Sequence, residues 1–134
     1  MTSNKSTEYF IASLDPFFLD KGEIWFSENR HKIKTQALSS IWWQENILFF
    51  EKDSSISPSE FMRKISDMGY EIVKTVASPG EFTSRGGIID IFPTNTTQAI
   101  RLDFFGNRIE NILPLGDQMS DDLRLKILNK KIKA

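Results

Sequence analysis

The chain has 134 residues, a net charge of -1, 40% apolar and 26% charged residues, and no cysteine. This length suits one domain or one domain with an appendage, and the composition is ordinary for a globular protein. It excludes disulfides and thiolate metal sites, and the near-zero charge argues against a general attraction to nucleic acid or membranes. The N-terminus lacks the pattern of a signal peptide, so we expect a cytoplasmic location.

The N-terminal third of the chain predicts short, mixed elements. Residues 6–15 predict a short helix that is capped by Ser6, and residues 22–26 predict a strand. Between residues 29 and 43 the apolar side chains recur at helical spacing, which predicts a longer helix. We interpret residues 1–44 as an appendage of unknown role.

A short buried strand over residues 46–51 comes before the clearest helix start in the sequence. Ser57 can serve as the N-cap, Pro58 suits the first helical position, and Glu60 can complete a capping box. The apolar residues that follow recur at i, i+4 and i+7, and Gly69 is the expected left-handed stop. The pattern therefore predicts an amphipathic helix that ends just before this glycine.

Three strands are predicted in the middle of the chain. Residues 70–77 are rich in β-branched side chains and predict a strand. The stretch EFTSRGGIIDIFP, residues 81–93, predicts two further strands that meet at Gly86 and Gly87, because two glycines permit a hairpin, bulge or corner. Pro93 ends the second of these strands, since proline cannot donate to a β-ladder.

A β-ribbon is predicted from residues 99–105 and 108–113, joined by the two-residue turn Gly106-Asn107 of type II′. Because such a turn fixes the register, the two faces of the ribbon can be derived. The predicted core face contains Ile100, Leu102, Phe104, Ile109, Asn111 and Leu113. The predicted outer face contains Arg101, Asp103, Phe105, Arg108, Glu110 and Ile112.

Two features of the predicted outer face need explanation. Phe105 either folds over the turn or under the C-terminal tail, or it is an aromatic anchor between arginines, a combination enriched at interface hot spots. The derived register sets Asp103 opposite Glu110, and the two carboxylates repel unless Arg101 and Arg108 bridge them. This charged face is expected to contact solvent or a partner.

Arg85 and Asp90 lie in the two strands that precede the ribbon. Arg85 either pairs with a carboxylate such as Asp90 or is held for an acidic group of a partner, because its fork binds carboxylates bidentately. Asp90 lies between two isoleucines, and this position favours a structural carboxylate that accepts backbone N–H bonds over a catalytic acid.

The elements together predict an α+β fold with a small, mostly antiparallel sheet with hairpins, packed by a few helices. The segments PGEFTSRGGIIDIFP and IRLDFFGNRIENI closely resemble the second domain of the UvrB and Mfd family of bacterial repair proteins. The preceding SPSEFMRKISDMGYEIVKTV resembles the helix and strand that enter that domain, and the glycine-rich segment is more similar to the Mfd version. From the resemblance we expect residues 45–117 to form the family's interaction domain.

The resemblance implies a non-catalytic module that docks on UvrA, the damage-sensing ATPase of nucleotide excision repair. Carried over by position, the residues that contact UvrA in the family correspond here to Arg85, Arg101 and Phe105. Asp103, Arg108 and Glu110, which share the predicted outer face with Arg101 and Phe105, are candidate supporting residues. Larger family members contain helicase lobes, but this sequence has no G-x-x-x-x-G-K-[ST] loop, so we expect no nucleotide binding and no cofactor.

Other functions stay open at this point. The basic C-terminal tail, residues 118–134, has a net charge of +3 and predicts a helix or a strand, so a nucleic-acid-binding accessory protein is the alternative. An enzyme would have to rely on His31, whose polar surroundings predict an exposed side chain, and we expect neither a catalytic nor a metal site. The sequence leaves open whether the module stands alone or belongs to a longer protein.

Overall fold

The computed structural model describes residues 8–115 and confirms the α+β class, with two sheets and five helices in this range. The helices are α1 (Pro16–Leu19), α2 (Glu23–Glu28), α3 (Arg30–Ala37), α4 (Ile41–Asn46) and α5 (Pro58–Asp67). The strands are β1 (Tyr9–Ala12), β2 (Ile47–Phe50), β3 (Glu71–Ile72), β4 (Glu81–Arg85), β5 (Ile88–Phe92), β6 (Ile100–Phe105) and β7 (Arg108–Pro114). No helix of the described part is long and apolar enough to cross a membrane.

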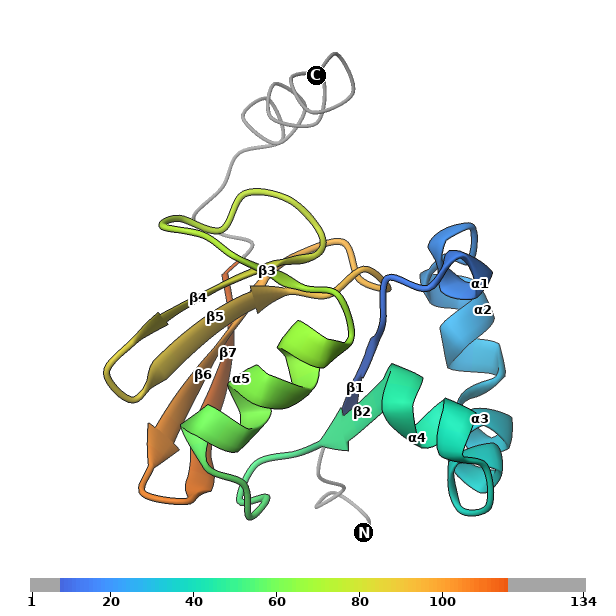
Figure 1. Ribbon diagram of the computed structural model, residues 1–134, viewed down its shortest axis with the longest axis horizontal. Helices are drawn as coiled ribbons and strands as arrows, with labels where there is room; N and C mark the ends of the chain where they lie inside the picture. Colours follow the sequence, from blue (N-terminus) through green and yellow to red (C-terminus); the bar gives the residue numbers. More distant parts are fainter. Residues whose placement is uncertain (1–7, 116–134) are drawn as a thin grey trace, which may run out of the picture.

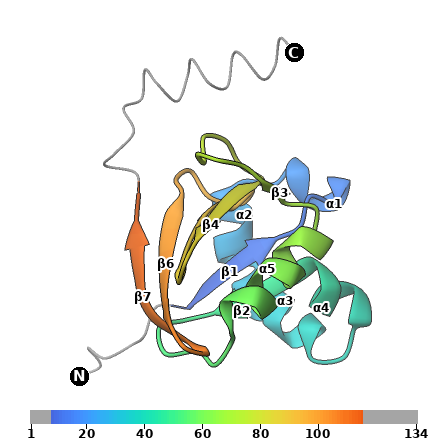
Figure 2. The same cartoon turned by 60° about the vertical axis from the view of Figure 1, so that its left-hand side comes forward.

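The larger sheet has the strand order β3-β4-β5-β6-β7 and is antiparallel except for the short pairing of β3 with β4. Strands β1 and β2 form a separate antiparallel ribbon. This ribbon lies between α5 and the group of helices α1 to α4 (Figure 1). Seen from the side, β7 is the last strand of the larger sheet and lies far from those four helices (Figure 2).

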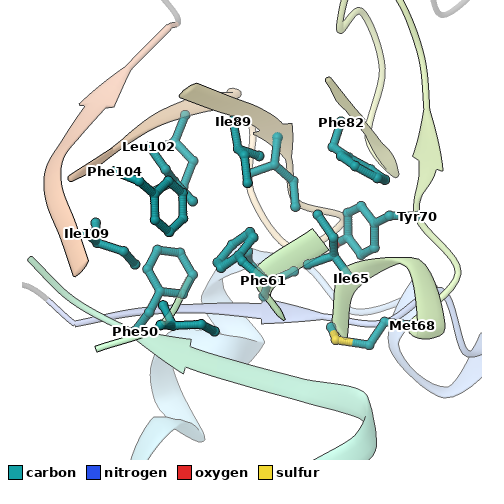
Figure 3. Packing of buried hydrophobic residues seen from close by; sticks show 14 residues of the cluster. Phe50, Phe61, Ile65, Met68, Tyr70, Phe82, Ile89, Leu102, Phe104 and Ile109 are labelled. Carbon is teal, nitrogen blue, oxygen red and sulfur yellow. The ribbon is translucent and has the colours of Figure 1, made fainter. Parts of the chain in front are cut away.

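Helix α5 covers one face of the larger sheet and follows the local sequence signals closely. The Ser57 hydroxyl accepts a hydrogen bond from the backbone N–H of Glu60 at 3.1 Å, and Gly69 has a φ of +103° after the helix. Phe61 and Ile65 are fully buried and point into the core beneath the strands (Figure 3). The predicted helix over this segment is therefore confirmed.

The β1–β2 ribbon joins two hydrophobic cores because its side chains alternate between its two faces. Ile11 and Phe50 belong to the core beneath the larger sheet, which also holds α5. Phe10, Ala12 and Ile47 belong to a second core, to which α1, α2 and α4 contribute aromatic side chains and α3 contributes Ile33. We refer to residues 8–46 as the N-terminal unit and to residues 47–115 as the sheet unit.

The outer edge of β1 is closed by side chains of the sheet unit. Asn95 accepts from the Ala12 N–H at 3.2 Å and donates to the Phe10 carbonyl at 3.0 Å, as a neighbouring strand would. The Tyr70 hydroxyl donates to the Ala12 carbonyl at 2.7 Å and accepts from the Thr94 N–H at 3.0 Å. Burial raises the pKa of Tyr70 to about 12. These bonds tie the two units together.

Several predictions for the N-terminal unit are wrong. Residues 9–12 form strand β1 and not part of a helix, because Tyr9 to Ala12 pair with β2 far along the chain. Residues 23–28 form helix α2 where a strand was expected. The predicted helix over residues 29–43 is split, since the Ser40 hydroxyl caps a new helix by accepting from the Trp43 N–H.

The strands of the sheet unit match the predictions more closely. Residues 47–50, 81–85 and 88–92 are strands, and the glycine pair joins the last two as a hairpin. The strand predicted over residues 70–77 is shorter, because only residues 71 and 72 pair with β4. The remainder of that segment folds over the outer face of the sheet.

Candidate protein-docking surface

The β6–β7 ribbon forms the predicted hairpin, but its register changes along the strands. The turn pairs Phe105 with Arg108 as predicted, and its glycine has a φ of +60°, as a type II′ turn requires. A β-bulge then shifts the pairing after Asp103, which lies opposite Asn111. The predicted pair of Asp103 with Glu110 is therefore wrong, because the bulge inserts an extra residue into β7.

The bulge exchanges the faces of the last two apolar residues of β7. Leu113 was expected in the core and Ile112 outside. In the structure Ile112 packs against the main core, whereas Leu113 is 51% exposed and lies directly across from Arg101. A two-residue turn fixes the register only as far as the first inserted residue, since a slip of one residue reverses the face of each later side chain.

The outer face of the larger sheet, opposite α5, carries the three predicted contact residues. Paired residues share a face, so Arg85 lies beside Ile88 and Ile88 lies beside Asp103. In the next row Arg101 lies beside Leu113. We call this surface the outer patch, and it consists of Arg85, Ile88, Arg101, Asp103, Phe105, Asn111 and Leu113.

Phe105 is the most exposed apolar residue of the outer patch. Its side chain is on the solvent side of β6 and the residue is 60% exposed, whereas the preceding Phe104 is buried in the main core. An aromatic ring in water forgoes roughly 1.5–3 kcal/mol relative to full burial. Together with Leu113 it gives the patch an apolar component that water does not favour.

Arg101 is held by a carboxylate of the neighbouring strand. Its Nε donates to Oδ1 of Asp90 at 2.8 Å and its Nη2 donates to Oδ2 at 2.9 Å. The hydrogen bonds that Arg101 donates to this carboxylate, and then the carboxylate's charge, raise the pKa of Arg101. The prediction that Asp90 is a satisfied structural carboxylate is confirmed, but its donors are guanidinium N–H groups and not the backbone N–H groups that were expected. Because a guanidinium has five N–H donors, this pairing leaves three for other groups.

Arg85 stands at the end of β4 and is exposed. Within residues 8–115 it makes no ion pair, because the carboxylate of Asp90 binds Arg101 instead. The two strands that follow place Ile88 and Asp103 in the same row as Arg85. Its guanidinium is therefore a cation at the margin of the patch whose fork can accept an external carboxylate.

Arg108 and Glu110, two of the predicted supporting residues, lie at the edge of the patch. Nη1 of Arg108 donates to Oδ1 of Asp53 at 2.8 Å, and its Nη2 is 4.0 Å from Glu110. Asp53 also donates its N–H to the Ile109 carbonyl and has a positive φ of 74°. Arg108 thus fastens the hairpin to the preceding loop, which is a structural role.

The opposite end of the outer face is covered by the chain itself. Val76, Phe92 and Ala99 form a small buried cluster, and Val73 and Leu115 pack against it. The residues that connect β3 to β4 therefore close this end of the sheet, and the outer patch is confined to the end near the hairpin turn. The other end, near the hairpin turn, keeps exposed residues of mixed charge and apolar character within residues 8–115.

The other predicted features give no competing site in the described part of the chain. His31 is exposed on α3, as expected. Among residues 8–115 no group of three or more His, Asp or Glu side chains could hold a metal ion. The basic tail, residues 118–134, lies outside the described residues. Sequence reasoning did not identify the contact of Asp90 with Arg101 or the exposed Leu113.

A profile described as the UvrB interaction domain matches residues 48–128, which is more than half of the chain. The chain belongs to this family. Among curated proteins, the transcription-repair-coupling factor of Bacillus subtilis is 32% identical over 82 residues, or 61% of this chain and 7% of that protein. The protein of the same name from Staphylococcus aureus strain RF122 is 37% identical over 80 residues, or 60% of this chain and 7% of its own length.

The match locates the outer patch inside the UvrB interaction domain. All seven residues of the patch lie between positions 85 and 113, within the matched range. The matched segment corresponds to only a small part of the much longer curated relatives. The resemblance to the UvrB and Mfd family is confirmed, and the chain is a relative of factors that couple transcription to DNA repair.

Proposed function

We propose that this chain is a non-catalytic binding module that docks on UvrA in bacterial nucleotide excision repair or transcription-coupled repair. In this proposal it acts in the cytoplasm and needs no cofactor, nucleotide, nucleic acid or membrane for docking. The residues proposed to contact UvrA are Arg85, Arg101 and Phe105. The residues proposed to support them are Asp103, Arg108 and Glu110.

The observation that carries the proposal is the exposed Phe105 on the same sheet face as two arginines. Arginines and aromatic side chains are enriched at hot spots of protein interfaces. Phe105 is 60% exposed although the adjacent Phe104 is buried, so its exposure is specific to the outer face. Membership in the UvrB interaction domain family supports a protein partner for this face.

The chemistry of the outer patch specifies what the partner surface must offer. The Phe105 ring and Leu113 need an apolar pocket or plane, because their burial supplies the gain in free energy. Arg85 and the free N–H groups of Arg101 need carboxylates. We therefore expect an acidic and partly apolar surface on UvrA, and an affinity that falls as ionic strength rises.

Isothermal titration calorimetry of the purified chain with purified UvrA tests the proposal. We expect Phe105→Ala to weaken binding by about tenfold or more, as truncation of an interface hot spot does. Arg85→Ala should weaken binding by a smaller factor, because its contact lies at the margin of the patch. Both substitutions are at exposed positions, so circular dichroism spectra and unfolding midpoints should stay close to those of the wild type.

Two matched controls separate the patch from general surface effects. Ile72→Ala removes another exposed apolar side chain of the same sheet, and Arg63→Ala removes an exposed arginine of α5. Neither residue belongs to the outer patch, so both variants should bind like the wild type. Absence of binding by folded wild-type protein would contradict the proposal. Equal weakening by the controls would contradict the assignment of the contact to this face.

A further inference from the structure

The pairing of Arg101 with Asp90 has a geometry that leaves one side of the guanidinium open. The carboxylate of Asp90 is 12% exposed and receives the Nε and Nη2 groups of Arg101 at 2.8 and 2.9 Å. Both N–H groups of Nη1 and the second N–H of Nη2 are directed away from these bonds, because the guanidinium is planar and its donors form a fixed fork. The Arg101 side chain is 37% exposed, so part of it can be reached by a partner.

The strand register fixes the position of the pair, of which Arg101 belongs to the outer patch and Asp90 lies next to it on β5. Asp90 and Arg101 are direct cross-strand neighbours on β5 and β6, and Leu113 is the next neighbour of Arg101 on β7. Asp103, two residues further along β6, also raises the pKa of Arg101 through its charge. The guanidinium is therefore tied to the centre of the sheet, and an exposed apolar side chain lies beside it.

We propose that Asp90 is a positioning residue for docking, which holds Arg101 so that its open side receives a carboxylate of the partner. One guanidinium then bridges two carboxylates, one from this chain and one from an Asp or Glu of the partner. This inference rests on the proposed docking on UvrA and adds the residue that prepares the contact. Asp90 is not among the residues to which the resemblance to the UvrB and Mfd family assigns docking.

The physical reason is the conformational entropy of a long side chain. An unrestrained arginine must lose rotamer freedom when it binds, and this loss weakens association. In this chain the bonds to Asp90 fix Arg101 when the sheet folds, so most of that cost does not fall on docking. A lysine at the same position would keep the charge, but its compact ammonium group cannot bind two carboxylates with two parallel pairs of hydrogen bonds.

The first test is a double-mutant cycle measured by calorimetry with purified UvrA. Asp90→Asn keeps the shape of the side chain and removes its charge and one acceptor of the bidentate pair. We expect it to weaken binding by about three- to tenfold, as the loss of one ordered arginine implies. In the Arg101→Ala background the same substitution should cause no further loss, because Asp90 acts only through Arg101. Asp67→Asn, at an exposed carboxylate of α5, is the control and should leave affinity unchanged.

The second test needs no substitution at Asp90 and therefore does not depend on the folding of a variant. The Nε–H of Arg101 should exchange with solvent more slowly than the Nε–H of Arg85 in nitrogen-15 NMR spectra of the free protein. This difference follows from the hydrogen bond of 2.8 Å to Asp90, whereas Arg85 has no ion pair within residues 8–115. In the complex with UvrA the Arg101 signal should stay protected.

The outcomes distinguish this inference from the function on which it rests. Wild-type binding that is weakened by Arg101→Ala and by Asp90→Asn, with no additivity in the double variant, supports both. Binding that Arg101→Ala weakens and Asp90→Asn does not, or equal exchange rates for the two arginines, overturns the positioning role and leaves docking intact. Additive losses in the cycle also overturn it, because Asp90 then acts independently. Failure of the wild type to bind overturns docking and this inference together.

Discussion

The two units of the chain bury their apolar side chains to very different degrees. The sheet unit covers its core with α5 on one side and the β1–β2 ribbon on another, and Phe61, Ile89 and Leu102 are completely buried (Figure 3). Its large exposed apolar residues within the described range are Ile72, Phe105 and Leu113. The shorter N-terminal unit exposes Phe17, Leu19, Ile24, Leu38, Ile41 and Trp42.

This contrast shows how far each unit depends on tertiary contacts. The four helices of the N-terminal unit have only four to eight residues, and helices of this length are not stable by themselves in water. They are held by ring contacts, such as Phe18 stacked on Trp42 at 5.6 Å, and by the shared β-ribbon. The sheet unit instead has a ten-residue capped helix and hairpins with defined turns. We expect the N-terminal unit to need the sheet unit more than the reverse.

The largest expected effect is that of Phe61→Ala in the sheet unit. This ring is completely buried between Phe50 and Phe104, so its truncation should lower the free energy of unfolding by about 3–5 kcal/mol. All three tryptophans lie in the N-terminal unit, so their fluorescence reports that unit separately from far-ultraviolet circular dichroism. Both signals should shift to the same lower urea midpoint, because the β1–β2 ribbon belongs to both cores. A fluorescence transition that does not move would show that the two units unfold independently.

The next effect is a loss of stability at alkaline pH through Tyr70, which bonds to both units. Its pKa is raised to about 12 in the folded chain, against about 10 in the unfolded chain, because burial disfavours the phenolate. The contribution of protonated Tyr70 to the free energy of unfolding is complete below pH 10. It is lost as the pH rises toward 12, and the total loss is about 3 kcal/mol. Urea unfolding at several pH values checks this expectation. In Tyr70→Phe that part of the pH dependence should be absent, and an unchanged slope would assign it to other groups.

A pair of glycine variants tests the contact between the two units. Gly69 and Gly106 both have positive φ, at +103° and +60°, so alanine is strained at either position. An added Cβ at Gly69 meets the Cβ of Leu14, in the N-terminal unit, at 3.2 Å, whereas at Gly106 it meets open space. We expect a loss of about 1 kcal/mol for Gly106→Ala and about 2 kcal/mol or more for Gly69→Ala. Thermal unfolding of both variants gives the difference, and equal losses would show that Leu14 yields freely.

The smallest expected effect compares exposed aromatic residues of the two units. Phe105→Ala should change the free energy of unfolding by less than about 0.5 kcal/mol, because the ring has no aromatic contact within the described residues and is 60% exposed. Trp42→Ala should cost about 1–2 kcal/mol, since its ring contacts Phe17, Phe18 and Trp43. Denaturant titrations compare the two. A large loss for Phe105→Ala would mean that this ring stabilises the sheet and is not reserved for a partner.

Local signals in the sequence predicted the elements whose contacts are local. Ser57 and Gly69 mark the two ends of α5, and Gly106 marks a tight turn, because capping and positive φ depend on a few adjacent residues. The strand β1 was missed, since Tyr9 to Ala12 become a strand only by pairing with β2 and by the side chain of Asn95. Short apolar segments of this kind fit a helix or a strand equally well.

The candidate site was predicted in part for the same reason. The face of Phe105 and Arg101 follows from alternation along one strand, which a sequence displays directly. The bulge that exposes Leu113 has no local marker of its own, and the partner of Arg101 depends on the register of β5 against β6. These two strands are joined by a loop over residues 93–99, whose length does not fix a register as a two-residue turn does.

The amino-acid sequence alone determined the α+β class, the capped helix, the hairpin turns and the family likeness, because each depends on neighbouring residues or on a continuous motif. Only the tertiary structure decided that Asp90 binds Arg101, that Leu113 faces solvent, and that one β-ribbon serves two cores. Those facts depend on strand register and on contacts between distant segments. These contacts stabilise the fold only after the distant segments have come together, and the local sequence of either segment does not indicate which segment it will pair with.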